Sequence, residues 1–350
     1  MGIVAAWYRK SPWLYLLWPL SLLYCVLAAS RRKRLERARE NAPVRPPVIV
    51  IGNISVGGTG KTPLLILLAR TLLARGVRVG IVSRGYGGKC EHSPCEVTAH
   101  SAVDEVGDEA VLIRRSVACP MFVDALRTRA VDALVSHYGC ELILSDDGLQ
   151  HYALTRAREL VVLDGTRMFG NGLCLPAGPL REPIKRLQEV DYLLVNGGDA
   201  ASWQADLPLL PERLQAQQMT LQPAAWVQLQ TGRRLPLNAL PLPENARLYA
   251  LAGIGNPTRF FDTLRALGYA PQCHPFPDHH RFSAQDVAFA GDDCLVMTHK
   301  DAVKCAAWVG ANAWYLEVEA QLDANFLLQL CNDMQSLLTP AVADDDHKRD

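Results

Sequence analysis

The sequence has no excess of charge of either sign, because 36 Lys and Arg residues balance 36 Asp and Glu residues. A chain without a net charge does not attract nucleic acid as a whole, so we expect no nucleic-acid partner. The ten cysteines lack the paired spacing of a disulfide framework, and we expect reduced thiols, as in cytosolic proteins. A zinc site is not expected either, because no zinc-binding pattern matches the spacing of Cys90, His92, Cys95 and His100.

A glycine-rich turn between a strand and a helix is the clearest motif. An apolar run at 47–51 precedes it, and a helical pattern at 62–74 follows. In this context backbone N–H groups cradle phosphates, a lysine reaches the β- and γ-phosphates, and a hydroxyl binds Mg²⁺. The general phosphate-loop pattern would place its first glycine at Ser55, so we expect Gly57 and Gly58 to supply the flexibility. The residues expected to bind a nucleoside triphosphate are Ser55, Val56, Gly57, Gly58, Thr59, Gly60, Lys61 and Thr62.

The stretch 11–30 contains no charged residue. Twenty helical residues span about 30 Å, the thickness of a bilayer core. More basic residues follow the stretch than precede it, which places the rest of the chain in the cytoplasm. Pro19 lies in the middle and predicts a kink, so a half-inserted helix remains open beside a spanning one. A cleaved signal peptide would export a nucleotide-binding domain away from its ATP, and the basic flanks argue against a buried core helix.

Acidic pairs follow two further elements. A strand at 142–144 runs into Asp146 and Asp147, as in a Walker-B element that holds Mg²⁺. Asp108 and Glu109 open another helix. In one interpretation Asp108 is an N-cap and Glu109 a first-turn acid that complements the helix dipole. In the other, the two acids deprotonate a hydroxyl and hold Mg²⁺. Both interpretations of this second pair stay open. The expected metal ligands are Thr62, Glu109, Asp146 and Asp147.

Strand and helix patterns alternate along most of the chain, which predicts parallel sheets covered by helices. A proline-rich stretch at 201–243 interrupts this order and includes one strand of a small antiparallel pair, at 225–229. His279 and His280 follow Asp278 in a later loop, where structural histidines and a functional Asp-His element are both possible. We expect an α/β protein with two Rossmann-like, phosphate-loop-type domains and an N-terminal membrane helix. The expected boundaries are 1–35 for the membrane helix and its basic flank, 36–203 for the phosphate-loop domain, 204–245 for a β connector, 246–338 for a smaller α/β domain and 339–350 for a disordered tail.

Seven motifs together resemble the tetraacyldisaccharide 4′-kinase family. They are GNISVGGTGKTP at 52–63, SRGYG at 83–87, GDE at 107–109, DDGLQH at 146–151, GPLREP at 178–183, FPDHH at 276–280 and THKDAVK at 298–304. The resemblance covers nearly the whole chain, including the N-terminal apolar segment. Ser55 agrees with the family although it departs from the general phosphate-loop pattern.

The resemblance implies a reaction in which ATP phosphorylates the 4′-hydroxyl of a tetraacyl-glucosamine disaccharide 1-phosphate, a lipid A precursor. It implies ATP and Mg²⁺ as cofactors, a lipid substrate, no obligate protein partner, and the cytoplasmic face of the inner membrane. The family's base and its histidine partner fall on Asp108 and His279. The expected substrate-binding residues are Arg84, Tyr86, His151 and Arg181.

A second hypothesis from another class is a membrane-tethered nucleotide switch or partitioning-type ATPase that acts on a protein. The phosphate loop of such proteins often has an extra lysine before the Gly-Gly pair. Val56 occupies that position here, which weakens this interpretation.

Overall fold

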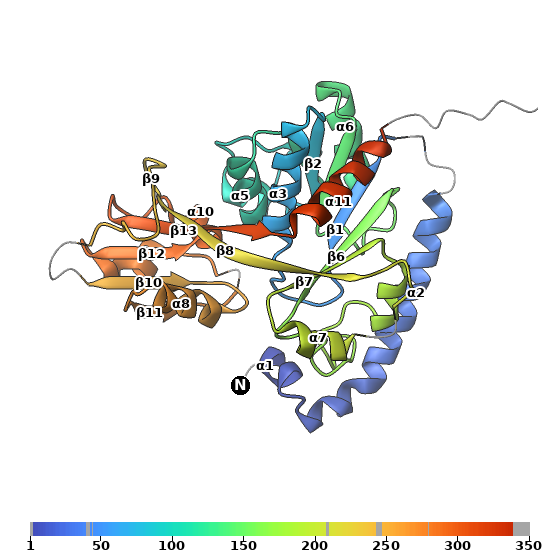
Figure 1. Ribbon diagram of the computed structural model, residues 1–350, viewed down its shortest axis with the longest axis horizontal. Helices are drawn as coiled ribbons and strands as arrows, with labels where there is room; N and C mark the ends of the chain where they lie inside the picture. The colour runs from blue at the N-terminus through green and yellow to red at the C-terminus, as the bar shows by residue number, and fades with distance from the viewer. Residues whose placement is uncertain are drawn as a thin grey trace, which may run out of the picture.

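The computed structural model describes residues 3–39, 43, 45–207, 210–242, 247–278 and 280–338. Within them, thirteen strands form one sheet (Figure 1). The strand order is β11-β10-β12-β13-β8-β7-β6-β1-β5-β2-β4-β3, and β9 pairs with β8. The expected α/β class with mostly parallel strands and an N-terminal apolar helix is confirmed.

The larger half of the sheet, β1 to β7, holds the phosphate loop. Six of its strands are parallel, and β3 is an antiparallel edge strand. The strands are β1 (Val48–Gly52), β2 (Val79–Ser83), β3 (Cys95–Glu96), β4 (Met121–Val123), β5 (Leu142–Asp146), β6 (Arg158–Asp164) and β7 (Tyr192–Asn196). The helical segments are α3 (Lys61–Ala74), α4 (Val103–Val106), α5 (Asp108–Ser116), α6 (Arg127–Tyr138), the 3-10 helix η2 (Ile184–Glu189) and α7 (Ala200–Asp206).

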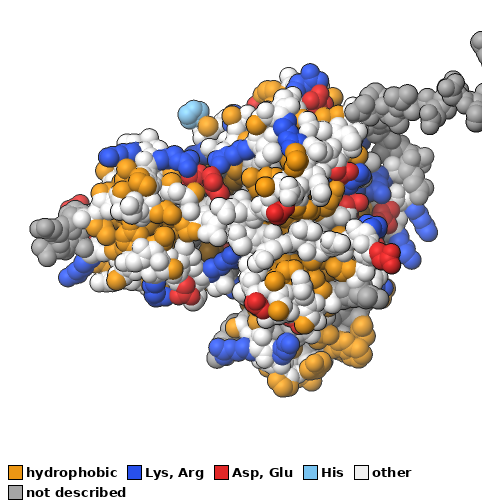
Figure 2. Space-filling view, viewed as in Figure 1, with side chains coloured by type: hydrophobic (Ala, Val, Ile, Leu, Met, Phe, Trp, Pro, Cys, Tyr) orange, Lys and Arg blue, Asp and Glu red, His pale blue; other side chains and the backbone are white. Residues whose placement is uncertain are grey.

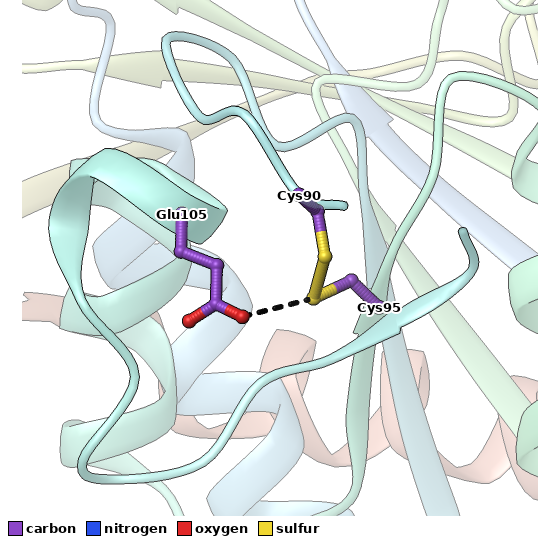
Figure 3. A group of neighbouring side chains, drawn as sticks. All are labelled: Cys90, Cys95 and Glu105. Carbon is purple, nitrogen blue, oxygen red and sulfur yellow. Dashed lines mark hydrogen bonds between the residues drawn. A yellow bond between two sulfur atoms is a disulfide. The ribbon is translucent and has the colours of Figure 1, made fainter. Parts of the chain in front are cut away.

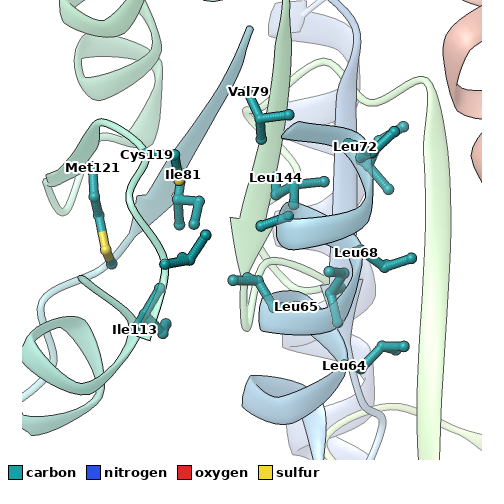
Figure 4. Close-up of a cluster of buried hydrophobic side chains, with 14 of the residues drawn as sticks. Leu64, Leu65, Leu68, Leu72, Val79, Ile81, Ile113, Cys119, Met121 and Leu144 are labelled. Atoms are coloured by element: carbon teal, nitrogen blue, oxygen red, sulfur yellow. The ribbon is translucent and has the colours of Figure 1, made fainter. Parts of the chain in front are cut away.

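Both faces of this half of the sheet are buried. Alternate side chains of a strand point to opposite faces, so one strand contributes to two cores. Ile49 and Ile51 of β1 pack in one core with α3 and α5, which Figure 4 shows in part. Val48 and Val50 pack in a second core with α6. The near-continuous apolar run of β1 therefore follows from a strand that is covered by helices on two sides.

The smaller half of the sheet, β10 to β13, is built the same way. Its strands are β10 (Leu248–Ala252), β11 (Gln272–Pro275), β12 (Cys294–Thr298) and β13 (Ala313–Gln321), all parallel to their neighbours within this half. Its helical segments are α8 (Pro257–Ala266), α9 (Ala284–Val287), the 3-10 helix η3 (Ala288–Ala290) and α10 (His299–Cys305).

One long strand, β8 (Ala216–Gln228), joins the two halves (Figure 1). It begins parallel to β7 and ends antiparallel to β13 and to the short β9 (Arg234–Leu235). The antiparallel strand expected at 225–229 is therefore the end of a longer strand. After β13 the last helix, α11 (Ala324–Ser336), packs against α3 in the core of the larger half. The expected domain boundaries stay an expectation.

The N-terminal segment consists of α1 (Ile3–Tyr8), the 3-10 helix η1 (Pro12–Leu17) and α2 (Trp18–Arg39). The break falls before Trp18, so Pro19 lies in the first turn of α2. The expected interruption of the apolar segment therefore lies next to Pro19, as a change from 3-10 to α-helix and not as a kink within α2. Proline is tolerated in a first turn because the N–H that it lacks has no intrahelical partner there.

One face of this segment packs against the segment 174–181, which precedes η2. Leu14 is fully buried. The Ser21 hydroxyl donates to the carbonyl oxygen of Cys174 over 2.8 Å and accepts from the N–H of Ala177 over 3.0 Å. The Tyr24 hydroxyl donates to the carbonyl oxygen of Arg181 over 3.0 Å.

The opposite face is apolar and exposed, and Figure 2 shows these side chains gathered around the start of α2. By length and composition, residues Pro12–Arg39 could cross a membrane. The exposed apolar residues are Trp13, Tyr15, Leu16, Trp18, Leu20, Leu22, Leu23, Val26 and Leu27.

The cysteines differ from our expectation at one place. Cys90 and Cys95 form a disulfide, with Glu105 Oε1 3.9 Å from the Cys95 sulfur (Figure 3). Sequence spacing does not reveal this pair, because it depends on the turn between the two cysteines. That turn brings their Cα atoms to 6.4 Å from each other. In this form the sulfurs are bonded to each other and offer no thiolate to a metal ion.

Candidate functional site

The phosphate loop connects β1 to α3 and is held from both sides. The N–H of Val56 donates to the carbonyl oxygen of Pro179 over 2.9 Å. On the other side, the Asn196 amide donates to the carbonyl oxygen of Thr59 over 2.9 Å. Gly57 and Gly60 have φ of 108° and 95°, which only glycine adopts readily. Ser55 is not among the residues with positive φ, so glycine is not required at this position.

Asp147 lies directly beside the loop lysine. Its carboxylate is 3.4 Å from Lys61 Nζ and 2.9 Å from Arg181 Nη1. Burial alone would raise the pKa of Asp147, but Lys61 and Arg181 outweigh it and hold that pKa well below its usual range. Asp147 is therefore an anion that holds the Lys61 and Arg181 side chains in place beside the phosphate loop.

Asp146 has a different environment at the end of β5. Its side chain is buried, and Oδ2 accepts from the Ser83 hydroxyl over 3.1 Å. Burial and the nearby carboxylates of Glu109 and Asp147 raise the pKa of Asp146 to about 7. Oδ1 is buried without a hydrogen-bond partner among the described residues. An unpartnered carboxylate oxygen beside a phosphate loop fits a hard cation such as Mg²⁺, which prefers oxygen ligands.

Asp108 and Glu109 begin α5 and face the smaller half of the sheet. Asp108 is buried, and its Oδ1 accepts from the N–H of Glu109 over 2.9 Å. Lys300, in the first turn of α10, lies 3.1 Å from Glu109 Oε1 and 3.9 Å from Asp108 Oδ2. Its Nζ is also 3.9 Å from Oδ1 of Asp278. His279, the expected partner of Asp108, lies outside the described residues.

A group of basic side chains surrounds His151 on the other side of Asp147. Burial, with Arg127 and Arg156 nearby, lowers the pKa of His151 to about 4, so its imidazole is neutral at pH 7. Arg84 adds to the same effect. The Arg127 side chain is buried and donates through Nη2 to the carbonyl oxygen of Asp147 over 3.0 Å. Its Nε and Nη1 have no hydrogen-bond partner within the described chain.

The loop that carries Arg84 and Tyr86 lies against the turn before Asp108. A Cβ on Gly107 would come within 2.5 Å of the carbonyl oxygen of Tyr86. The Tyr86 side chain itself is 65% exposed. Of the expected substrate-binding residues, Arg84 and His151 thus lie near each other, Arg181 contacts Asp147, and Tyr86 faces solvent beside the α5 turn.

Sequence reasoning missed Arg127 and Lys300. Arg127 is the first residue of α6, and Lys300 is the second residue of α10. The dipole of a helix disfavours cations at its N-terminus. A basic residue in a first turn is therefore a signal that the side chain has a partner elsewhere, and this signal is visible in the sequence once the helix is placed.

A strand, a glycine-rich loop and a helix that starts with Lys61 and Thr62, with acids at the end of a neighbouring strand, define an α/β protein of the phosphate-loop class. The family model for tetraacyldisaccharide-1-P 4′-kinase (LpxK) matches residues 13–335. The chain belongs to this family.

Three comparisons describe the similarity. The chain is 47% identical over 339 residues to a tetraacyldisaccharide 4′-kinase of Pseudomonas putida, which covers 96% of this chain and 97% of that protein. It is 49% identical over 321 residues to the same-named protein of Azotobacter vinelandii, covering 91% and 92%. A crystal structure of LpxK from Aquifex aeolicus in complex with ATP has a TM-score of 0.75 at 24% identity and covers 93% of this chain and 99% of that one. The last comparison concerns the fold.

Proposed function

We propose that this protein transfers the γ-phosphoryl group of ATP to the 4′-hydroxyl of tetraacyldisaccharide 1-phosphate at the cytoplasmic face of the inner membrane. One structural observation supports it most directly. Arg181 contacts Asp147 at the phosphate loop through its side chain, and its carbonyl oxygen accepts from Tyr24 of the apolar α2. A single segment thus lies between a lipid-compatible helix and a phosphate-binding loop, as a kinase with a lipid acceptor requires.

On the donor side, the loop N–H groups and Lys61 would bind the β- and γ-phosphates of ATP. Mg²⁺ would neutralise charge on the transferred phosphoryl group. Thr62, Glu109 and Asp146 are the residues that would hold it, and the unpartnered oxygen of Asp146 is the best suited of them. Asp147 was also expected to bind the metal, but its contacts with Lys61 and Arg181 favour a role in orienting those cations.

On the acceptor side, Asp108 would take the proton of the 4′-hydroxyl, with His279 as its partner. Asp108 fits this role because it is buried next to Glu109, and a fixed carboxylate can meet a hydroxyl without reorganisation. The 1-phosphate of the lipid would bind at Arg84 and Arg127. The Nε and Nη1 groups of Arg127, which have no hydrogen-bond partner among the described residues, would donate to the phosphate, and the guanidinium would supply the positive charge.

We further propose that α2 lies on the membrane surface and does not span it. Ser21 and Tyr24 lie within the apolar stretch and hydrogen-bond to backbone groups of the segment 174–181. A helix that crossed the bilayer would separate these groups, because the folded chain cannot enter the hydrocarbon. The exposed apolar face would enter one leaflet, and the basic residues that follow would meet lipid phosphates.

The test uses the purified full-length protein, labelled ATP and the disaccharide 1-phosphate lipid in mixed micelles. We expect labelled lipid to form, and its absence would reject the proposed reaction. Asp108→Ala and His279→Ala should each lower turnover by about a hundredfold or more while ATP binding persists. Asp104→Ala, an exposed acid four residues away, is the matched control and should retain activity. Near-normal turnover in both site variants would reject the roles given to Asp108 and His279.

A further inference from the structure

Lys300 belongs to the smaller half of the structure, and its ammonium contacts carboxylates of the larger half. Its ammonium is 3.1 Å from Glu109 and 3.9 Å from Asp108, both on α5. The Lys300 side chain is only 18% exposed, so solvent screens these contacts weakly.

The start of α10 is held in place, and this fixes where Lys300 can reach. Asp301 is fully buried and accepts from the N–H of Gly253 over 2.9 Å and from the Thr298 hydroxyl over 2.6 Å. The same turn therefore anchors the loop after β10. A Cβ on Gly255 of that loop would lie 3.7 Å from the N–H nitrogen of Gly58 in the phosphate loop.

Three carboxylates converge on this ammonium, since Asp278 also lies 3.9 Å from it. Like charges at such distances repel, and a central cation offsets the repulsion. Without the cation, Glu109 and Asp108 would turn away from each other or recruit other partners. A carboxylate displaced by about 1 Å from a working geometry can cost about a hundredfold in rate.

We propose that Lys300 is a positioning residue of the kinase site, which holds Glu109 and Asp108 side by side and completes the site from α10. This inference rests on the proposed function, in which those two acids work on the acceptor and the metal. Lys300 acts through the carboxylates, so its removal should affect turnover more than nucleotide binding.

The experiment compares Lys300→Met, Lys300→Arg and the wild type in the full-length protein with ATP, Mg²⁺ and the lipid acceptor. We expect Lys300→Met to lower kcat by about tenfold to a hundredfold with the KM for ATP changed by less than about threefold. Lys300→Arg keeps a cation at the same place and should recover at least part of the loss. A normal kcat in Lys300→Met, with an active wild type, would overturn the inference but leave the proposed function intact. An inactive wild type would reject the proposed function itself.

A double-mutant cycle separates positioning from general stability. In a Glu109→Gln background, Lys300→Met should lower kcat by less than about threefold, because residues that act as a unit do not add. The matched control is Arg70→Met. Arg70 of α3 makes an ion pair with Glu319 of β13, with 3.2 Å between Nη1 and Oε1, and this pair lies away from the site. We expect Arg70→Met to lower the melting temperature without a kcat change that depends on Glu109. Independent, fully additive losses from Lys300→Met and Glu109→Gln would refute positioning.

Discussion

The packing of α2 against the segment 174–181 can be tested with one side chain. Ser21→Ala removes only the hydroxyl and with it both of its hydrogen bonds. The N–H of Ala177 would remain buried without its Ser21 partner, whereas the carbonyl oxygen of Cys174 keeps the hydrogen bond that it accepts from the N–H of Gly178 over 2.9 Å. An unsatisfied buried N–H costs about 1–3 kcal/mol, so the docked state of α2 should lose about 1–3 kcal/mol.

Hydrogen–deuterium exchange across residues 174–181, measured with the protein bound to vesicles, is the direct assay. We expect faster exchange in Ser21→Ala and lower lipid-kinase activity, with vesicle binding retained because the apolar face is unchanged. Ser30→Ala on the exposed face of the same helix is the control and should leave exchange unchanged. If α2 instead crosses the bilayer, Ser21 lies in hydrocarbon, and exchange at 174–181 will be the same in Ser21→Ala and the wild type. That result would refute the surface-bound arrangement.

Two further substitutions test the loop and the smaller half of the sheet. Gly60→Ala should abolish ATP binding, measured by calorimetry, because φ of Gly60 is 95° and the new Cβ would lie 2.6 Å from the Asn196 amide nitrogen. Gly58 has open space around it, so Gly58→Ala should reduce ATP affinity less. Burial, with Arg115 and Arg70 nearby, lowers the pKa of His299 to about 4, so the unfolded chain binds its proton first as the pH falls. As the pH is lowered from about 6.5 to about 4, the free energy of unfolding of the wild type should therefore decrease relative to that of His299→Phe, as measured by urea titration. Equal pH profiles of the two proteins would contradict this.

The elements that the sequence predicted best are those whose signal is local. The strand at β1, the glycine turn and the start of α3 follow one another within about fifteen residues, and the structure places them as expected. The strand before Asp146 and Asp147 is confirmed as β5, next to β1. Alternation of apolar residues and helix-starting signals depend on neighbours in the chain, so one sequence is enough to read them.

The elements that the sequence did not predict depend on partners far along the chain. β8 looked like a short strand in a proline-rich connector, because its first residues become a strand only by pairing with β7. The sequence pattern of α11 gives no sign of its packing partner: Leu330, Cys331 and Met334 pack in the core around α3. Nothing in the apolar pattern of a helix says which of two cores it will join.

The role of the segment 174–181 follows from the same physical limit. In the sequence it is an irregular loop with a GPLREP motif and no periodic pattern. In the structure its backbone meets Ser21 across 153 residues of chain, and the Arg181 side chain meets Asp147 across 34. Backbone groups without a helix or strand must find partners elsewhere if they are buried, and such partners are supplied by tertiary contacts. The link between the apolar helix α2 and the phosphate loop is therefore made of long-range hydrogen bonds and an ion pair, and a local pattern cannot encode it.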